Sequence, residues 1–226
     1  MNQVVNVIDL GMVNAFLLKG ENLIMVDTGY DNHYDKVLTY LESHHVDPKK
    51  IKLIVITHNH SDHVSNLKRL HRLTGADVVA HVDAAAELEK GINSPVIPNT
   101  LWSKFVFNVL GFMLPESKIE FKPNQVFDDE FDLSPYGIKG KLIHTPGHTA
   151  SSISVVLDTG EAMIGDMIVG RKKGNSVVAK MHRIAQNPEL RLSSLLHLLH
   201  IGVTTFYPSH GEMCSSDAVR DLLEKP

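Results

Sequence analysis

Residues 57–63 read THNHSDH, and this short stretch decides how the rest of the chain is interpreted. It places three histidines and one aspartate within six positions: His58, His60, Asp62 and His63. Four such side chains cannot share one face of a helix, whereas a tight loop can direct all of them toward one point. Imidazole and carboxylate groups together suit zinc, and to a lesser extent iron or manganese. The stretch predicts a metal-binding loop; the alternative is a polar loop whose histidines bond only to backbone groups.

The residues around this loop predict an α/β fold. The run IKLIVIT, residues 51–57, is short, β-branched and apolar enough to be a strand buried on both faces. Elsewhere in this half the pattern predicts a hairpin of 16–19 with 23–27, a helix at 32–44 capped by Asp31, a helix ending at Gly75, a strand at 77–81 and a helix at 83–90. The loop thus follows the carboxyl end of a strand, where α/β proteins place their ligands.

Three further candidate ligands follow predicted strands in the second half. His148 lies in IHTPGHTASS after a Pro-Gly turn, Asp166 follows EAMIG, and His210 lies in YPSHGE. The pattern predicts strands at 139–144, 152–157, 161–165 and 204–207, and helices at about 188–200 and 215–224. With the loop, these residues supply five histidines and two aspartates. That is too many for one tetrahedral metal and enough for two metals that share a carboxylate.

Composition predicts a soluble globular protein of the cytoplasm. The 226 residues are 43% hydrophobic and 21% charged, and we expect a single domain over residues 1–226. A net charge of −4 argues against nucleic-acid binding through a basic face. The N-terminus lacks signal-peptide features, and no run of about 18 apolar residues predicts a membrane span. The one cysteine, Cys214, cannot form an intrachain disulfide, and we interpret it as a free small residue rather than a nucleophile.

One segment departs from the alternation of strands and helices: residues 95–115, PVIPNTLWSKFVFNVLGFMLP. Its few polar or small positions fall three or four apart, and most of the others are apolar. A helix that is apolar around most of its circumference must be covered on more than one side. We therefore expect an apolar helical insertion at about 95–115, which is a core helix, a lid over the active site or the contact of a homodimer.

These motifs together resemble the metallo-β-lactamase-fold hydrolases over essentially the whole chain. The family's five motifs occur in order as Asp27 in VDTG, the H-x-H-x-D-H loop, His148, Asp166 and His210. The resemblance implies a four-layer αββα sandwich of two similar halves, with the metals at one edge of the sheets. The α/β alternation predicted above agrees with that fold.

The resemblance also implies a role for each residue and a cofactor of two Zn²⁺ per chain, with iron or manganese as alternatives. The first metal would be held by His58, His60 and His148. The second would be held by Asp62, His63 and His210. Asp166 would bridge them, and Asp62 and Asp166 would be the catalytic carboxylates. Asp27 would be a buried residue that supports the loop rather than a ligand, although a capping aspartate in a turn has the same local sequence.

The mechanism follows from these charges. Two divalent ions about 3.5–4 Å apart would hold a water between them and lower its pKa toward neutrality. The resulting hydroxide would attack an electrophilic carbonyl of a small-molecule substrate. One metal would stabilise the oxyanion and the other the leaving group, so that no serine or cysteine nucleophile is needed.

The substrate is predicted to be a thioester, ester or lactone, because HTPGHTASSISVVL is similar to the glyoxalase II branch of the family. Histidine at position 60 favours hydrolysis over oxygen reduction, and the presence of both Asp62 and His63 disfavours several β-lactamase subclasses. Met167 and its neighbours stand where related lactonases carry a tyrosine, which weakens that assignment. The alternatives are a lactonase or β-lactamase-type amide hydrolase, a mononuclear iron persulfide dioxygenase, and a non-catalytic sensor on the same fold.

Several residues near the motifs have two interpretations. Arg171, Lys172 and Lys173 could bind an anionic substrate group or form a solvated charge cluster. His144 and His182 could approach a substrate or could be structural.

Overall fold

Two apolar β-sheets form the centre of the protein. The computed structural model describes residues 4–98, 105 and 118–224. The first sheet has the order β1-β2-β3-β4-β5-β6, formed by Val4–Asp9, Asn14–Lys19, Leu23–Val26, Ile51–Val55, Asp77–His81 and Gln125–Phe127. The second has the order β15-β13-β10-β9-β8-β7, formed by Cys214–Ser215, Thr205–Tyr207, Glu161–Met163, Ile153–Leu157, Gly140–His144 and Glu130–Asp132. A small third sheet orders β12 (Ser176–Met181), β11 (Ile168–Lys173) and β14 (His210–Gly211).

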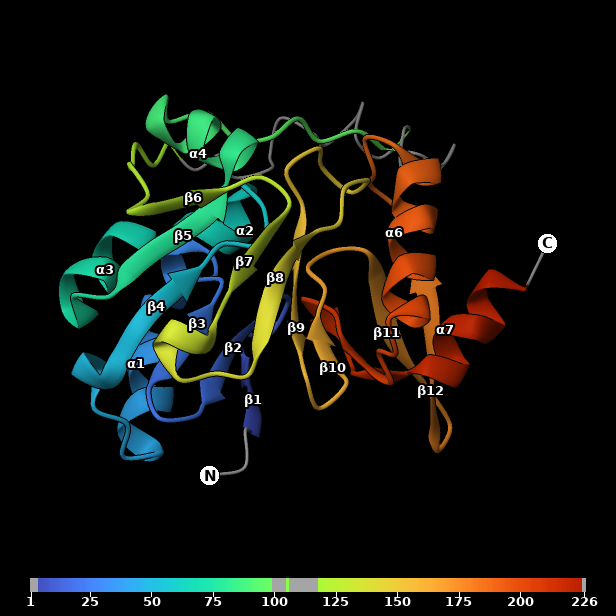
Figure 1. Cartoon of the computed structure of the whole chain (residues 1–226), viewed down its shortest axis with the longest axis horizontal. Helices are drawn as coiled ribbons and strands as arrows, with labels where there is room; N and C mark the ends of the chain where they lie inside the picture. The colour runs from blue at the N-terminus through green and yellow to red at the C-terminus, as the bar shows by residue number, and fades with distance from the viewer. Residues whose placement is uncertain (1–3, 99–104, 106–117, 225–226) are drawn as a thin grey trace.

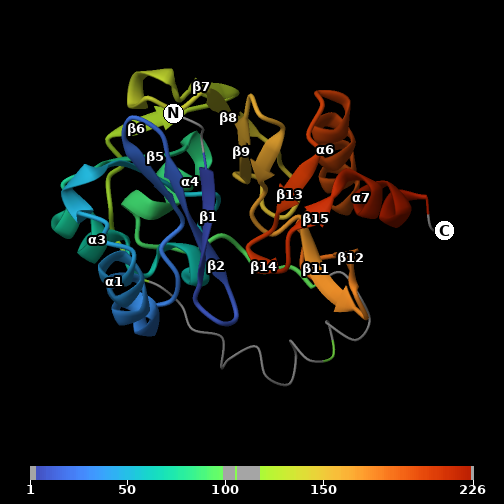
Figure 2. The ribbon, with the colours of Figure 1, turned by 90° about the horizontal axis from the view of Figure 1, so that it is seen from below.

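Helices cover the outer face of each large sheet (Figures 1 and 2). The first sheet is covered by α1, α2, α3 and α4, which are Tyr34–Ser43, Ser61–Val64, Leu67–Thr74 and Val82–Glu89. The second is covered by α6 (Pro188–His200) and α7 (Ser216–Leu223). Short 3-10 turns lie at Asp31–His33, Pro48–Lys50 and Ser134–Tyr136. The result is the four-layer αββα sandwich that the sequence predicts.

Each interface between layers has its own apolar core. In β4, Leu53 and Val55 face the second sheet, whereas Ile54 and Ile56 face the helices of the first half. The same alternation occurs in β2, where Phe16 packs between the sheets. A third cluster joins the second sheet to α6 and α7. The prediction of a strand at 51–57 buried on both faces is therefore confirmed for Ile51–Val55, apart from the exposed Lys52, because this strand lies between the helices and the second sheet; residues 56 and 57 lie beyond its end.

The sequence pattern was less accurate at element ends and in short strands. The strand predicted to extend to residue 165 ends at Met163, and Asp31 opens a 3-10 turn rather than capping α1, whose N-cap is His33. The hairpin of β11 and β12 was not predicted, because β11 ends in the charged and exposed run 171–173 and neither strand has a regular alternation of buried and exposed residues. Helix α6 begins at Pro188 as predicted, with Asn187 accepting hydrogen bonds from two backbone N–H groups of its first turn.

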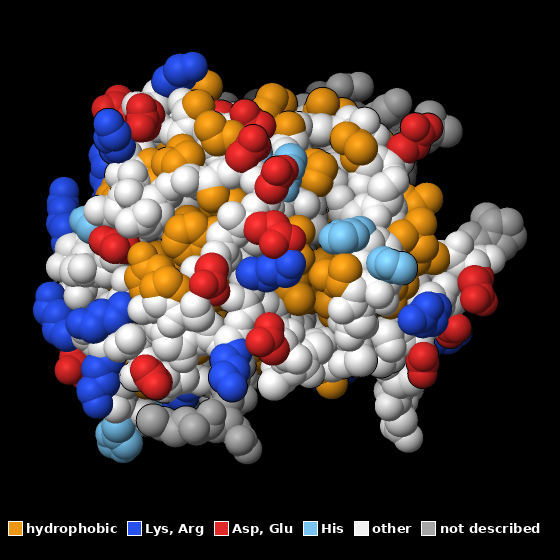
Figure 3. Space-filling view, in the orientation of Figure 1, with side chains coloured by type: hydrophobic (Ala, Val, Ile, Leu, Met, Phe, Trp, Pro, Cys, Tyr) orange, Lys and Arg blue, Asp and Glu red, His pale blue; other side chains and the backbone are white. Residues whose placement is uncertain are grey.

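Most of the predicted insertion at 95–115 lies outside the described residues, so its helix, lid and dimer interpretations stay predictions, as does the single domain. Within the described ranges, no helix combines the length and apolar character that crossing a bilayer requires. On the face shown in Figure 3, apolar side chains are interspersed with charges of both signs, and Lys and Arg gather along the edge over α1 and α3.

Candidate metal centre

The predicted ligands follow strands that end near one another. Strands β3 and β4 run parallel, and they lead into Asp27 and the loop 56–63. Strands β10 and β13 also run parallel, and they lead into Asp166 and His210. His148 follows β8. Because parallel strands share an edge at their carboxyl ends, residues far apart in the sequence meet there.

A first group consists of three imidazoles and one carboxylate, each offering one ligand atom within 4.8 Å of the others: His58, His60, His148 and Asp166. Nδ1 of His60 lies 3.1 Å from Nε2 of His58 and 3.1 Å from Nε2 of His148. The carboxylate oxygen Oδ2 of Asp166 lies 3.5 Å from Nε2 of His148. All four side chains are buried, and the group could hold a metal ion.

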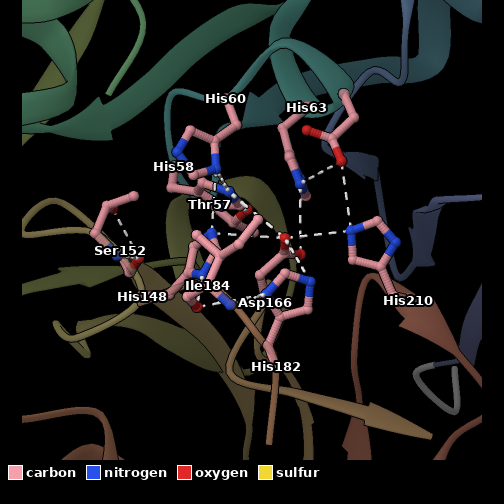
Figure 4. Close-up of polar contacts among 12 residues, drawn as sticks. Thr57, His58, His60, His63, His148, Ser152, Asp166, His182, Ile184 and His210 are labelled. Carbon is pink, nitrogen blue, oxygen red and sulfur yellow. Dashed lines mark hydrogen bonds and ion pairs between the residues drawn. The ribbon is translucent and has the colours of Figure 1, made fainter. Parts of the chain in front are cut away.

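A second group has two imidazoles and two carboxylates under the same 4.8 Å limit: Asp62, His63, Asp166 and His210. Nε2 of His210 lies 3.3 Å from Oδ2 of Asp62 and 3.2 Å from Oδ2 of Asp166. Nε2 of His63 lies 3.4 Å from Oδ1 of Asp166. Figure 4 shows Asp166 between the two groups, with His58, His60 and His148 on one side and His63 and His210 on the other. The structure therefore brings together all seven candidate ligands named from the sequence.

The outward nitrogens of four imidazoles are held by oxygen atoms. These contacts are His58 Nδ1 to Thr57 Oγ1 (3.1 Å), His63 Nδ1 to Asp27 Oδ2 (2.8 Å), His148 Nδ1 to the Ile184 carbonyl (3.0 Å) and His210 Nδ1 to the Met12 carbonyl (2.6 Å). Since each oxygen accepts a hydrogen from Nδ1, the neutral ring presents the lone pair of Nε2 to the centre. This is the tautomer that metal binding requires.

Three buried polar atoms of the candidate metal centre have no hydrogen-bond partner among the described residues: Nε2 of His60, Nε2 of His63 and Oδ1 of Asp166. Such atoms are expected where a metal ion would be their partner. Buried polar atoms are rarely left in this state. Divalent zinc accepts imidazole nitrogen and carboxylate oxygen, so the donor set and the unsatisfied atoms of His63 and Asp166 both fit metal ions.

Without a metal, contacts between the histidines and the aspartates of the second group shift the pKa values of both. Burial opposes ionisation of Asp62 and Asp166, but contacts with His63 and His210 hold the pKa of each carboxyl well below its usual range. The same contacts outweigh burial in His210 and raise its pKa to about 11, and they raise the pKa of His63 as well. In the first group, burial and neighbouring imidazoles lower the pKa of His58 well below its usual value.

Asp27 organises the loop from beneath and contributes no atom to either group. Its carboxylate accepts hydrogen bonds from the backbone N–H and hydroxyl of Thr57, at 2.8 and 2.7 Å, and from His63. Asp27 has a φ of 60°, a left-handed conformation that aspartate tolerates better than most residues.

The turn before His148 depends on Gly147, where a Cβ atom would lie 2.2 Å from the Arg191 backbone nitrogen.

His182 lies beside the two ligand groups, whereas the sequence alone did not decide whether it approaches the site or is structural. Its ring lies 5.2 Å from the His148 ring and 5.4 Å from the His210 ring between centroids. His144 does not join it: that ring stacks on His81 at 4.0 Å, and its Nε2 contacts the Ala150 carbonyl at 2.7 Å. Only the tertiary structure separates the two histidines, because each is a single histidine that the sequence ties to no ligand motif.

The basic run after Asp166 lies on β11, and its side chains are exposed. Lys172 forms an ion pair of 2.9 Å with Glu212. The structure gives no contact between this run and the ligand groups, so it supports the interpretation as a solvated charge cluster.

Comparison with known proteins agrees with this architecture. The family model described as the metallo-beta-lactamase superfamily matches residues 8–210. The chain belongs to the metallo-beta-lactamase superfamily.

Relatives and solved structures within this superfamily are distant in sequence. The chain is 29% identical over 207 residues to the Beta-lactamase-like protein 2 homolog of Caenorhabditis elegans, covering 88% of this chain and 55% of that protein. It is 24% identical to a probable metallo-hydrolase of Methanocaldococcus jannaschii, covering 88% of each. The crystal structure of the BLEG-1 B3 metallo-beta-lactamase matches with a TM-score of 0.70 at 18% identity, covering 96% of this chain and 97% of that one. At this identity the structural match shows the fold alone.

Proposed function

We propose that this chain is a dinuclear zinc hydrolase that cleaves a thioester, ester or lactone, similar to glyoxalase II. The observation that carries the proposal is the position of the Asp166 carboxylate. Its Oδ2 lies 3.5 Å from His148 in the first group and 3.2 Å from His210 in the second. One carboxylate within reach of both groups is the arrangement that two ions sharing a ligand require.

The first ion would be held by His58, His60 and His148, the second by Asp62, His63 and His210, and Asp166 would serve both. When bound, two zinc ions would lower the pKa of water between them and so supply a nucleophile at neutral pH. The chain's own residues prepare this chemistry by fixing the ring orientations from outside the centre, through Asp27, Thr57 and two backbone carbonyls.

The substrate reaches the centre from the side where its side chains are least buried. The side chains of His63, His58 and His148 are 0–1% exposed, and that of Asp166 is 3% exposed. Those of Asp62 and His210 are 12% and 20% exposed. An acyl carbonyl would therefore approach over Asp62 and His210, and the two catalytic carboxylates, Asp62 and Asp166, would face it from the second group.

Two features favour hydrolysis without a protein nucleophile. Cys214 is fully buried and burial raises the pKa of its thiol to about 11, which disfavours the thiolate. The M. jannaschii relative is named a probable metallo-hydrolase, which is consistent with hydrolysis at a metal centre. Thioesters are the first substrates to test, because the motif HTPGHTASS at 144–152 is similar to the glyoxalase II branch.

The test combines metal counting with a substrate panel. Protein prepared without chelator is expected to hold about two zinc ions per chain by elemental analysis. It is expected to hydrolyse an acyl-glutathione or acyl-lactone faster than nitrocefin or bis-nitrophenyl phosphate. Chelation should abolish turnover, and added zinc should restore it.

A pair of aspartate variants provides the matched control. Asp166→Ala should remove both turnover and metal, whereas Asp158→Ala, at an exposed turn, should change neither. One iron per chain with oxygen consumption would favour the persulfide dioxygenase instead. Full metal loading with no turnover of any panel member would favour the non-catalytic sensor.

A further inference from the structure

His182 lies on the open side of the metal centre. Its side chain is 16% exposed, close to the 20% of His210 and unlike the 1–3% of His148 and Asp166. Its ring stands edge-on to His148, at 81°, and nearly parallel to His210, at 21°. Figure 4 shows it beneath Asp166, on the far side from His63. A substrate that approaches over His210 therefore meets His182 as well.

The hydrogen bonds around Ile184 determine which nitrogen of His182 carries hydrogen. Nδ1 of His182 lies 3.4 Å from both the N–H and the carbonyl oxygen of Ile184. That carbonyl already accepts hydrogen bonds from His148 Nδ1, at 3.0 Å, and from Arg191 Nη1, at 3.2 Å. A carbonyl oxygen has two lone pairs, and both are used. This favours the tautomer in which Nδ1 of His182 accepts from the Ile184 N–H and Nε2 carries the hydrogen.

Among residues 4–98, 105 and 118–224, no group accepts a hydrogen bond from Nε2 of His182. Its nearest carboxylate oxygen, Oδ2 of Asp166, is 3.9 Å away, which is too long for a hydrogen bond. When neutral, His58, His63, His148 and His210 present the lone pair of Nε2 to the centre, because their Nδ1 atoms donate to oxygen. His182 has the opposite tautomer and presents an N–H group, so it is not set up to bind a metal through Nε2.

The backbone of His182 is held rigidly. Nη1 of Arg191, a residue that is 3% exposed, donates to the His182 carbonyl at 2.7 Å and to the Ile184 carbonyl. The buried guanidinium fixes the turn that carries the ring. A donor fixed in advance costs no reorganisation when charge develops on a substrate, and this is the property of an oxyanion hole.

We propose that Nε2–H of His182 donates a hydrogen bond to the carbonyl oxygen of the substrate and stabilises it as it becomes an oxyanion. The inference rests on the proposed hydrolase function. As hydroxide, formed from water that has lost its proton to solvent, bonds to the carbon, the π bond of the carbonyl breaks and its electron pair moves to the oxygen that faces His182. When the double bond re-forms, the bond to the thiolate or alkoxide breaks, and that leaving group departs with the bonding electron pair. The hydrogen stays on Nε2 throughout, so His182 acts as a donor and not as an acid.

Two amide variants distinguish loss of the hydrogen-bond donor from loss of the imidazole ring. The amide nitrogen of Gln at position 182 reaches about as far as Nε2, whereas that of Asn reaches only about as far as Nδ1. We expect His182→Gln to retain kcat within about fivefold and His182→Asn or His182→Phe to lose about 100-fold, with KM changed less than about threefold. His144→Phe is the matched control for loss of an imidazole outside the centre, and it should leave kcat and KM unchanged.

Two readouts do not depend on turnover. Zinc per chain should be the same in His182→Phe and in the wild type, whereas loss of one zinc would show that His182 is a ligand and overturn the proposal. Ring ¹H–¹⁵N correlation spectra of the zinc-loaded wild type should show hydrogen on Nε2 of His182. Hydrogen on Nδ1 alone would overturn the proposal whatever the turnover. An inactive wild type with hydrogen on Nε2 would instead count against the proposed hydrolase function.

Equal kcat in the Gln, Asn and Phe variants would also overturn the proposal, since a structural ring does not distinguish the two amides. Thermal unfolding of each variant checks that the fold persists. If His182→Phe does not fold, the comparison of Gln with Asn still decides the question.

Discussion

Nδ1 of His63 donates a hydrogen bond of 2.8 Å to Oδ2 of Asp27, and neither side chain is exposed to solvent. The same carboxylate oxygen accepts from the Thr57 hydroxyl, which in turn accepts from Nδ1 of His58. One carboxylate beneath the loop thus orients a ring in each ligand group. Groups of this kind commonly contribute 10–100-fold to metal affinity.

Asp27→Asn should therefore weaken zinc binding by about 10–100-fold without unfolding the protein. Asparagine has nearly the same shape and tolerates the left-handed backbone of φ 60° at this position, but it carries no charge to hold His63. The measurement is zinc competition against a chromophoric chelator. Asp158→Asn, in an exposed turn, serves as the control, and equal affinities in the two variants would contradict this role for Asp27.

Gly147→Ala should destabilise the protein by more than about 2 kcal/mol, as expected for a steric clash at a constrained backbone position. The added Cβ would lie 2.2 Å from the Arg191 backbone nitrogen at a φ of +136°, and relief of the clash would displace α6 or His148. Gly174→Ala is the control, because its φ of +62° is also left-handed but nothing lies within 4 Å. Its cost should be about 1 kcal/mol. Urea unfolding of metal-free protein measures both, and similar values would show that the close approach is relieved cheaply.

Zinc binding should release protons at neutral pH and become tighter as pH rises. In the metal-free protein, carboxylate contacts raise the pKa of His210 to about 11, so this ring is charged at pH 7, and they also raise the pKa of His63. His210 must lose a proton before its Nε2 can bind a cation. Calorimetry in buffers of different ionisation enthalpy measures the release, and a binding heat that does not depend on the buffer would contradict it.

The same shift predicts how the stability of metal-free protein depends on pH. A folded-state pKa of about 11 for His210, against 6.5 for the free side chain, stabilises the fold fully below pH 6.5. That stabilisation is lost as pH rises from 6.5 toward about 11. The free energy of unfolding should therefore fall over this window more steeply in metal-free than in zinc-loaded protein. Parallel urea titrations at several pH values test this, and equal slopes would contradict it.

Cys214 should be unreactive in the folded protein and dispensable for turnover. It is fully buried against α7 and β13, and burial raises the pKa of its thiol to about 11. A chromogenic disulfide reagent should label it only after unfolding, and Cys214→Ala should retain the wild-type rate. Rapid labelling of native protein, or loss of turnover with metal content intact, would show a role that burial does not predict.

From the residues alone, the sequence predicts an α/β fold and a metal-binding loop for a local physical reason, whereas the αββα arrangement and the roles of the seven candidate ligands are implied by its resemblance to the metallo-β-lactamase fold. His58, His60, Asp62 and His63 are adjacent in one loop, and the strand before them is apolar on both faces, so spacing and periodicity carry that information. The hairpin of β11 and β12 has no such periodicity, and its pairing is established only by the folded chain.

Tertiary structure decided what depends on contacts between distant residues. Sequence could not separate His182 from His144, because each is a single histidine near the end of a strand. The fold places the first beside His148 and His210 and stacks the second on His81. It also shows that the Ile184 carbonyl beside His182 accepts from His148 and Arg191, and our assignment of hydrogen to Nε2 of His182 rests on this. The direction in which a side chain presents its hydrogen is a property of its three-dimensional surroundings, and no local pattern encodes it.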